Sequence, residues 1–153
     1  MGAEKRIVEL GLQLPPPARP AGNYVPFKRT GNLLLLSGVG PHKPDGTFIA
    51  GIVGDDLSVE EGYNAARQCG LVLLANMRAA LGSLDQVASV VKVLGMVHCG
   101  PDFGKQPEVI NGCTDLFVEV FGDAGRPSRS AVGMIALPRG IAVEIEAMVE
   151  VKV

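Results

Sequence analysis

The stretch IAVEIEAMVEV at residues 141–151 alternates between apolar residues and a second set that includes three glutamates. Successive side chains of a β-strand point to opposite faces, so this period of two predicts a strand with one face in the core. The apolar face carries Ile141, Val143, Ile145, Ala147, Val149 and Val151, and the other face carries Glu144, Glu146 and Glu150. Carboxylates on one face of a strand usually mark its solvated side, so the stripe alone favours a structural role for them.

The residues before this strand predict two more strands and a helix. Residues 130–137 are predicted as a strand that the tight turn LPRG, residues 137–140, joins to 141–151 as a hairpin. Upstream of it, residues 107–121 carry apolar side chains at helical spacing. Residues 90–98 form an apolar segment typical of a strand.

The first half of the chain contributes the longest helix and two further strands. Ser58 and Glu61 have the spacing of a capping box, and Gly82 ends the predicted helix. Residues 24–28 and 33–37 are predicted as strands around the turn TGN. The apolar run LLLL within the second of them is typical of a strand buried on both faces.

These elements follow the order ββ-α-β-α-ββ, which predicts an α/β (α+β) fold with two helices on one face of a mixed sheet. Since no further helix is available for the opposite face, we expect another subunit to cover it. We divide the chain into residues 1–21, a short helix and a proline-rich arm, and residues 22–153, a single domain.

Composition and charge narrow the classes of function. The chain of 153 residues has a net charge of −2 and no cluster of Lys and Arg, so we expect no nucleic-acid partner. It shows no apolar run of membrane-spanning length and no secretory segment, so we expect no membrane association. Cys69, Cys99 and Cys113 lack disulfide or metal spacing, which favours free thiols and a cytoplasmic location. With His42 and His98 isolated, no motif predicts a metal or a cofactor.

Arg129 is the clearest candidate for a binding residue. It opens a predicted strand two residues after Pro127, and its guanidinium group can hold a carboxylate through two parallel hydrogen bonds. An ordinary surface arginine is the alternative. If the hairpin is regular, Glu144 lies opposite Ile135 and roughly 20 Å from Arg129. The two could then share a small-molecule site only across an interface between subunits, for which closed rings are the usual arrangement.

Several segments resemble one known family. Arg129-Ser130-Ala131-Val132, Leu137-Pro138 and Val143-Glu144-Ile145-Glu146-Ala147 resemble the C-terminal signature of the reactive intermediate deaminase superfamily, also called Rid or YjgF-like. Many of its members carry the older label L-PSP endoribonuclease. Asn23-Tyr24-Val25, Ser37-Gly38 and Asn111 also agree, and the resemblance spans residues 22–151.

The resemblance implies a chorismate-mutase-like fold assembled as a homotrimer, with three sites between subunits. It implies that Arg129 binds the carboxylate of a 2-imino or enamine acid and that Glu144 positions the water that attacks the imine carbon. The products would be a 2-oxo acid and ammonia, formed without a metal or cofactor. Tyr24, Ser37, Gly38 and Asn111 would line the pocket, together with backbone groups at Ala131.

Some positions depart from the family pattern and indicate a divergent branch. Ala131 stands where many deaminases have Cys, Val39 stands where the family has Gln, and the arm is additional to the minimal domain. Two other functions are therefore kept beside deamination. One is non-catalytic, regulatory binding of small carboxylates or 2-oxo acids, which needs Arg129 but not Glu144. The other is an endoribonuclease or translation inhibitor, which the acidic charge disfavours.

Overall fold

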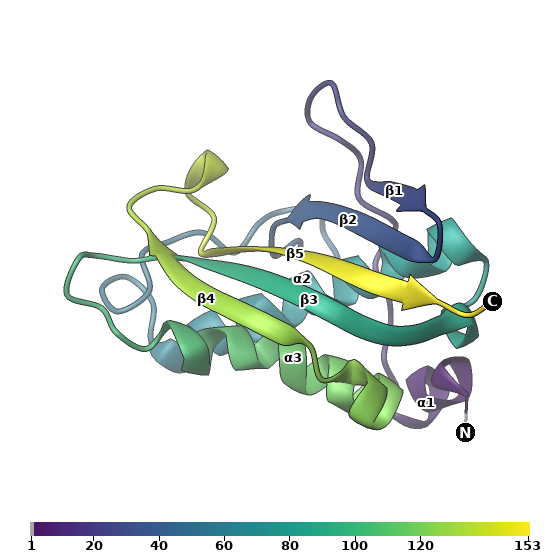
Figure 1. Cartoon of the computed structure of the whole chain (residues 1–153). Coiled ribbons are helices and arrows are strands. Elements are labelled where there is room, and N and C mark those ends of the chain that lie inside the picture. The colour runs from purple at the N-terminus through teal and green to yellow at the C-terminus, as the bar shows by residue number, and fades with distance from the viewer. Residues whose placement is uncertain (1) are drawn as a thin grey trace.

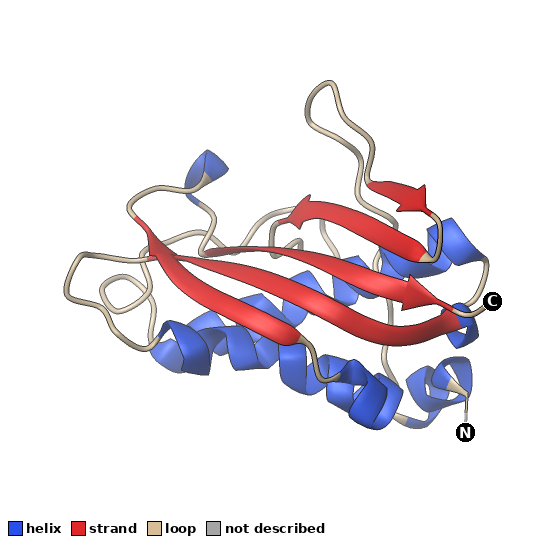
Figure 2. Ribbon diagram, in the orientation of Figure 1, coloured by secondary structure: helices blue, strands red, loops and turns tan. Residues whose placement is uncertain are grey.

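The computed structural model describes residues 2–153 and contains a five-stranded sheet with two long helices on one face (Figure 1). The sheet has the spatial order β1-β2-β5-β3-β4. The strands are β1 (Phe27–Thr30), β2 (Leu33–Val39), β3 (Val87–His98), β4 (Ser128–Met134) and β5 (Val143–Val151). Helices α2 (Val59–Leu81) and α3 (Gln106–Phe121) form the second layer, which Figure 2 shows in blue beneath the red strands. The predicted α/β (α+β) layer arrangement is confirmed.

The two long helices begin and end at residues that the sequence marks. Ser58 Oγ accepts a hydrogen bond from Glu61 N at 3.1 Å, and Glu61 Oε2 accepts one from Ser58 N at 2.7 Å, which is the predicted capping box. Gly82 ends α2 in a left-handed conformation, with φ +79°. Pro107 lies in the first turn of α3, where its missing N–H leaves no hydrogen bond unmade.

The predicted hairpin between the last two strands is wrong. β4 pairs with β3 in parallel, and β5 pairs with β3 and β2 in antiparallel fashion, so β3 separates β4 from β5. The segment β3-α3-β4 is a crossover unit, in which a helix carries the chain back to start a parallel strand. The turn at 137–140 exists as the short 3₁₀ helix η3 (Pro138–Gly140), but it lies in the connection that passes from one side of β3 to the other.

The helix-free face of the sheet is uncovered in a single chain. Leu34 and Leu36 of β2 are buried, whereas Leu35 between them is 38% exposed. The prediction that this run is buried on both faces therefore does not hold within one chain. On β5 the residues of the predicted apolar face are buried against the helices, and Glu144, Glu146 and Met148 lie on the uncovered face.

The N-terminal segment is held against the rest of the protein. In α1 (Ala3–Glu9), the carboxylate of Glu4 accepts hydrogen bonds from Arg78 Nε at 3.0 Å and from Leu84 N at 2.9 Å. In the arm, Ala18 N donates to Oδ1 of the buried Asn76 on α2 at 2.9 Å. The arm then leads to β1, which begins at Phe27 rather than at the predicted Tyr24. No helix in residues 2–153 is both long and apolar enough to cross a membrane.

Candidate active site

Glu144 lies on the uncovered face of β5, at the wall of a cavity of about 350 Å³. Two other predicted site residues, Tyr24 and Gly38, line the same cavity. A Cβ atom on Gly38 would lie only 3.0 Å from Glu144 Oε2, so glycine lets the carboxylate pack against the backbone of β2. Burial raises the pKa of the Glu144 carboxyl, and the negative charge of Glu146 raises it further.

Tyr24 lines the Glu144 cavity and Ser37 directly precedes Gly38, and the polar atoms of both side chains already form hydrogen bonds. Ser37 Oγ donates to the carbonyl oxygen of Val25 at 2.7 Å. Tyr24 is 49% exposed, and its hydroxyl oxygen accepts a hydrogen bond from Ala21 N at 3.2 Å. Both residues also line a smaller cavity that borders Gly38 and the arm. Four of the predicted residues, Tyr24, Ser37, Gly38 and Glu144, are thus brought together by β2, β5 and the segment before β1.

Arg129 lies in a different place, on the edge strand β4 and toward α3. Its Nη1 donates to Asn111 Oδ1 at 2.7 Å and to Thr114 Oγ1 at 3.1 Å. These three side chains line a second cavity of about 350 Å³. No carboxylate among residues 2–153 forms an ion pair with Arg129, so neutral side chains orient its guanidinium group and its charge is left free. Ala131, two residues further along β4, is half-buried on the same face.

The two groups lie on opposite faces of the sheet. Arg129 pairs with Val93 of β3 and turns toward α3, while Glu144 pairs with Met96 and turns to the uncovered face. The two residues are separated by two strand spacings across the sheet, about 10 Å in total, and by three residues along it, again about 10 Å in total. Their Cα atoms are therefore about 14 Å apart. The predicted position of Glu144 opposite Ile135 is therefore wrong, because it assumed that β4 and β5 pair as a hairpin. The separation inside one chain nevertheless still rules out a shared small-molecule site there.

Some residues of these two cavities were not predicted from the sequence. Thr114 follows Asn111 by three positions on α3, so helical spacing could have revealed that both face Arg129. Arg139 and Arg19 line the Glu144 cavity, together with His42 and Phe48. Arg139 was interpreted only as a turn residue and Arg19 only as part of the arm, because neither position belongs to a motif. No cluster of His, Cys, Asp and Glu that could hold a metal occurs in the part of the chain that the structure describes.

Comparison with known proteins agrees with this fold. Residues 4–143 match the model of the family described as "YjgF/chorismate mutase-like, putative endoribonuclease". TCP17 of Trypanosoma cruzi is 46% identical over 142 residues, which cover 92% of this chain and 89% of that protein. A solved structure from Shewanella oneidensis that carries the same endoribonuclease label is 31% identical with a TM-score of 0.94, and the match covers 99% of this chain and 100% of that chain.

The chain therefore belongs to the YjgF/chorismate-mutase-like family. The structure of RidA from an Antarctic Psychrobacter is 26% identical with a TM-score of 0.63, over 89% of this chain and 94% of that chain. The fold is thus closer to the Shewanella protein than to RidA, as expected for a divergent branch. Because the Shewanella match covers almost the whole chain, it includes the proline-rich arm.

Proposed function

We propose that this protein hydrolyses 2-imino and enamine acids to 2-oxo acids and ammonia, at sites that two copies of the chain form together. One observation carries the proposal. The chain presents an oriented guanidinium group on one face of its sheet and a half-buried carboxylate of raised pKa on the other, each in its own cavity. Within one chain neither cavity contains both side chains, so joining the Arg129 cavity of one copy to the Glu144 cavity of another would bring the two together.

The chemistry follows from the two charges. Arg129 binds the carboxylate of the imino acid and thereby fixes the neighbouring imine carbon beside Glu144. Glu144 holds a water molecule and takes its proton as the oxygen adds to that carbon. Glu144 then returns that proton to the nitrogen of the carbinolamine and takes the hydroxyl proton as the C–N bond breaks, which releases ammonia and leaves the 2-oxo acid. A carboxylate whose pKa is raised is a better base for this step than an ordinary surface glutamate.

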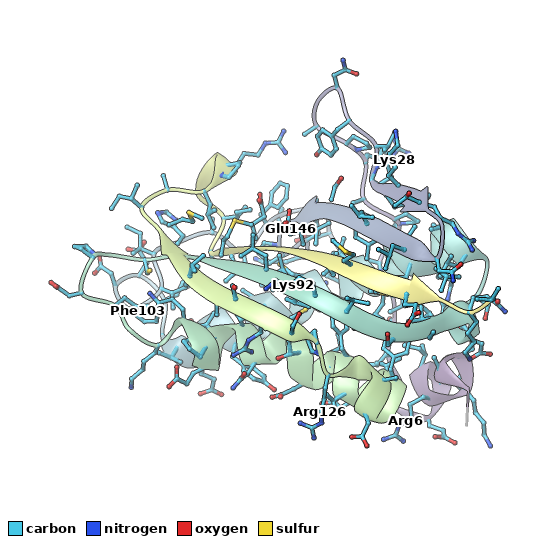
Figure 3. The ribbon with its side chains drawn as sticks, viewed as in Figure 1. Arg6, Lys28, Lys92, Phe103, Arg126 and Glu146 are labelled. Atoms are coloured by element: carbon cyan, nitrogen blue, oxygen red, sulfur yellow. The ribbon has the colours of Figure 1, made fainter. Side chains whose placement is uncertain are left out.

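The uncovered face supports assembly from several copies, and we propose a homotrimer. Leu35, Leu94 and Met148 stand on this face beside Lys92 and Glu146, and together they line a further cavity of about 360 Å³. Figure 3 shows Lys92 and Glu146 on the face of the sheet that the helices leave open. Apolar surface of this kind is usually buried, and in a ring each copy would place its Arg129 edge against the Glu144 face of the next.

A coupled assay tests the proposal. A pyridoxal-dependent dehydratase acting on serine or threonine would release the enamine, and the rate at which 2-oxo acid appears would be recorded with and without this protein. We expect acceleration by the wild type and none by Arg129→Ala or Glu144→Gln. Arg29→Ala is the matched control, because Arg29 is an exposed arginine that donates only to Gly31 O and lines none of these cavities.

The two alternative functions, non-catalytic carboxylate binding and RNA cleavage, predict different results for the same set of variants. A non-catalytic binder would show 2-oxo acid binding that depends on Arg129, with no acceleration by any variant. The endoribonuclease label of the relatives would apply if RNA were cleaved and the cleavage survived both Arg129→Ala and Glu144→Gln. Either result would replace the deaminase proposal.

A further inference from the structure

Two arginines line the Glu144 cavity without a carboxylate partner. Arg139 comes from η3 and Arg19 from the arm, and no acidic side chain within residues 2–153 forms an ion pair with either. Glu144 likewise has no ion-pair partner there. Glu144, Arg139 and Arg19 therefore line one cavity, and none of the three has an ion-pair partner among residues 2–153.

Arg139 is held at the cavity wall by an unusual backbone and by a ring. Its φ of +59° is the left-handed conformation, and among residues 2–153 it is the one non-glycine residue with positive φ. Its guanidinium carbon lies 5.7 Å from the ring centroid of Phe48, and the ring of His42 packs on the same ring with centroids 4.3 Å apart. Backbone strain of this kind persists where the surroundings enforce it, and it occurs disproportionately at binding sites.

Arg19 is placed at the same cavity by the arm. The hydrogen bond from Ala18 N to Asn76 Oδ1 holds the preceding residue against a fully buried side chain of α2. The bond from Ala21 N to the Tyr24 hydroxyl restrains the residues that follow. The arm thus forms a fixed wall of the cavity, and Arg19 is the charge that this wall contributes.

We propose that Arg139 and Arg19 bind a second carboxylate of the ligand, so that the site prefers 2-imino and 2-oxo dicarboxylic acids to monocarboxylic ones. This inference rests on the proposed function, in which Arg129 of the partner subunit takes the first carboxylate. A ligand with a neutral side chain would cover the two guanidinium groups and leave their hydrogen bonds unmade. A cavity of about 350 Å³ is in the range of small-molecule sites.

Calorimetric titration of the full chain with two product analogues tests the inference. The ligands are 2-oxoglutarate and 2-oxopentanoate, which have the same five-carbon chain and differ in the second carboxylate. We expect 2-oxoglutarate to bind about tenfold more tightly. Arg139→Gln and Arg19→Gln should each reduce the ratio of the two affinities, 2-oxoglutarate over 2-oxopentanoate. The double variant should bring this ratio close to one. Arg139→Lys, which keeps the charge, should retain part of the ratio, and Arg29→Gln should leave it unchanged.

Salt and folding controls make the outcome clear. The ratio should fall as sodium chloride is raised, because both guanidinium groups are exposed in the single chain and are screened by salt. Unchanged melting temperatures would show that the variants fold. A ratio near one in the wild type, or a ratio that survives the double variant, would overturn the inference. If the wild type still deaminates 2-iminopropanoate when the inference fails, the proposed function stands. If the wild type neither binds these ligands nor deaminates, both the inference and the proposed function are refuted.

Discussion

Arg129 and Glu144 lie on opposite faces of the same sheet, with β3 between their strands. Arg129 is oriented by Asn111 and Thr114 on the helix-covered side, and Glu144 stands in a cavity on the uncovered side. A single chain therefore holds the two halves of the candidate site apart. The proposed reaction requires both side chains to contact the same small ligand. Activity should therefore depend on the assembly of several copies.

Replacing Glu144 by Gln should remove activity while making the fold more stable at neutral pH. The raised pKa means that the folded state favours the protonated carboxyl, so the ionised form costs free energy above that pKa. Gln keeps the shape without the charge. After allowance for solvent screening we expect a gain of up to about 1 kcal/mol and a rise in Tm of roughly 2 °C. Turnover should fall at least about 100-fold.

Thermal melts of both proteins across the pH range check the sign of that effect. The advantage of Glu144→Gln should be full at pH 8 and should vanish below the ordinary carboxyl value of 4.5, where the wild-type side chain is protonated in both folded and unfolded states. A wild type more stable than the variant at pH 8 would mean that the Glu144 carboxylate is stabilised by a partner.

The pH dependence of kcat/KM should report the ionisation of the Glu144 carboxyl. Because Glu144 acts as a base, activity should decline as the pH falls through its pKa, and the raised pKa moves that decline above the ordinary carboxyl value. Rates at fixed ionic strength between pH 4 and 8, with coupling enzyme in excess, would measure it. An acid limb at or below 4.5 would contradict the role given to Glu144.

Thr114 should act as a positioning residue for Arg129. Thr114→Val removes the 3.1 Å hydrogen bond to the guanidinium group but keeps the shape of the side chain. We expect KM to rise about tenfold with a smaller change in kcat, since the hydrogen bond is to a charged group that binds substrate. Thr114→Ser, which keeps the hydroxyl, should restore KM. Equal KM values for all three proteins would show that Arg129 does not need this contact.

Gly38→Ala should displace the Glu144 carboxylate. The new Cβ would lie 3.0 Å from Oε2, which is closer than such atoms normally pack, so the carboxylate must move. We expect kcat to fall about tenfold, because small misplacements of a reacting group have large effects on rate. Gly100→Ala is the matched control, since a Cβ there meets nothing within 4 Å. Equal activity of the two variants would contradict the close packing of Glu144 in the active protein.

Local signals in the sequence predicted the elements of the fold well. Ser58 with Glu61 and Gly82 mark the ends of α2 through their own hydrogen-bonding and backbone properties, and these predictions are confirmed. The alternation at 141–151 also predicted which face of β5 is buried. Such features depend on neighbours in the sequence and can therefore be read without the fold.

Strand order could not be obtained in the same way. The turn at 137–140 has the composition of a hairpin turn, yet β4 pairs with β3 because α3 returns the chain to that edge. The error placed Glu144 opposite Ile135 and hid the fact that the two key residues face opposite ways. The contributions of Arg19 and Arg139 depend on contacts between distant elements, which no local pattern contains. Thr114 differs, because its helical spacing from Asn111 is local and could have placed both residues on one face of α3.

Mixing two inactive variants tests the central claim most directly. Arg129→Ala and Glu144→Gln would be co-expressed with different tags, and the assemblies that carry both tags would be purified and assayed. If each site of the proposed homotrimer takes Arg129 from one copy and Glu144 from the next, every trimer that contains both variants has one intact site out of three, so the purified assemblies should show about a third of wild-type activity. If mixed assemblies form and are as inactive as either variant alone, the two residues do not meet across an interface, and the composite site is wrong.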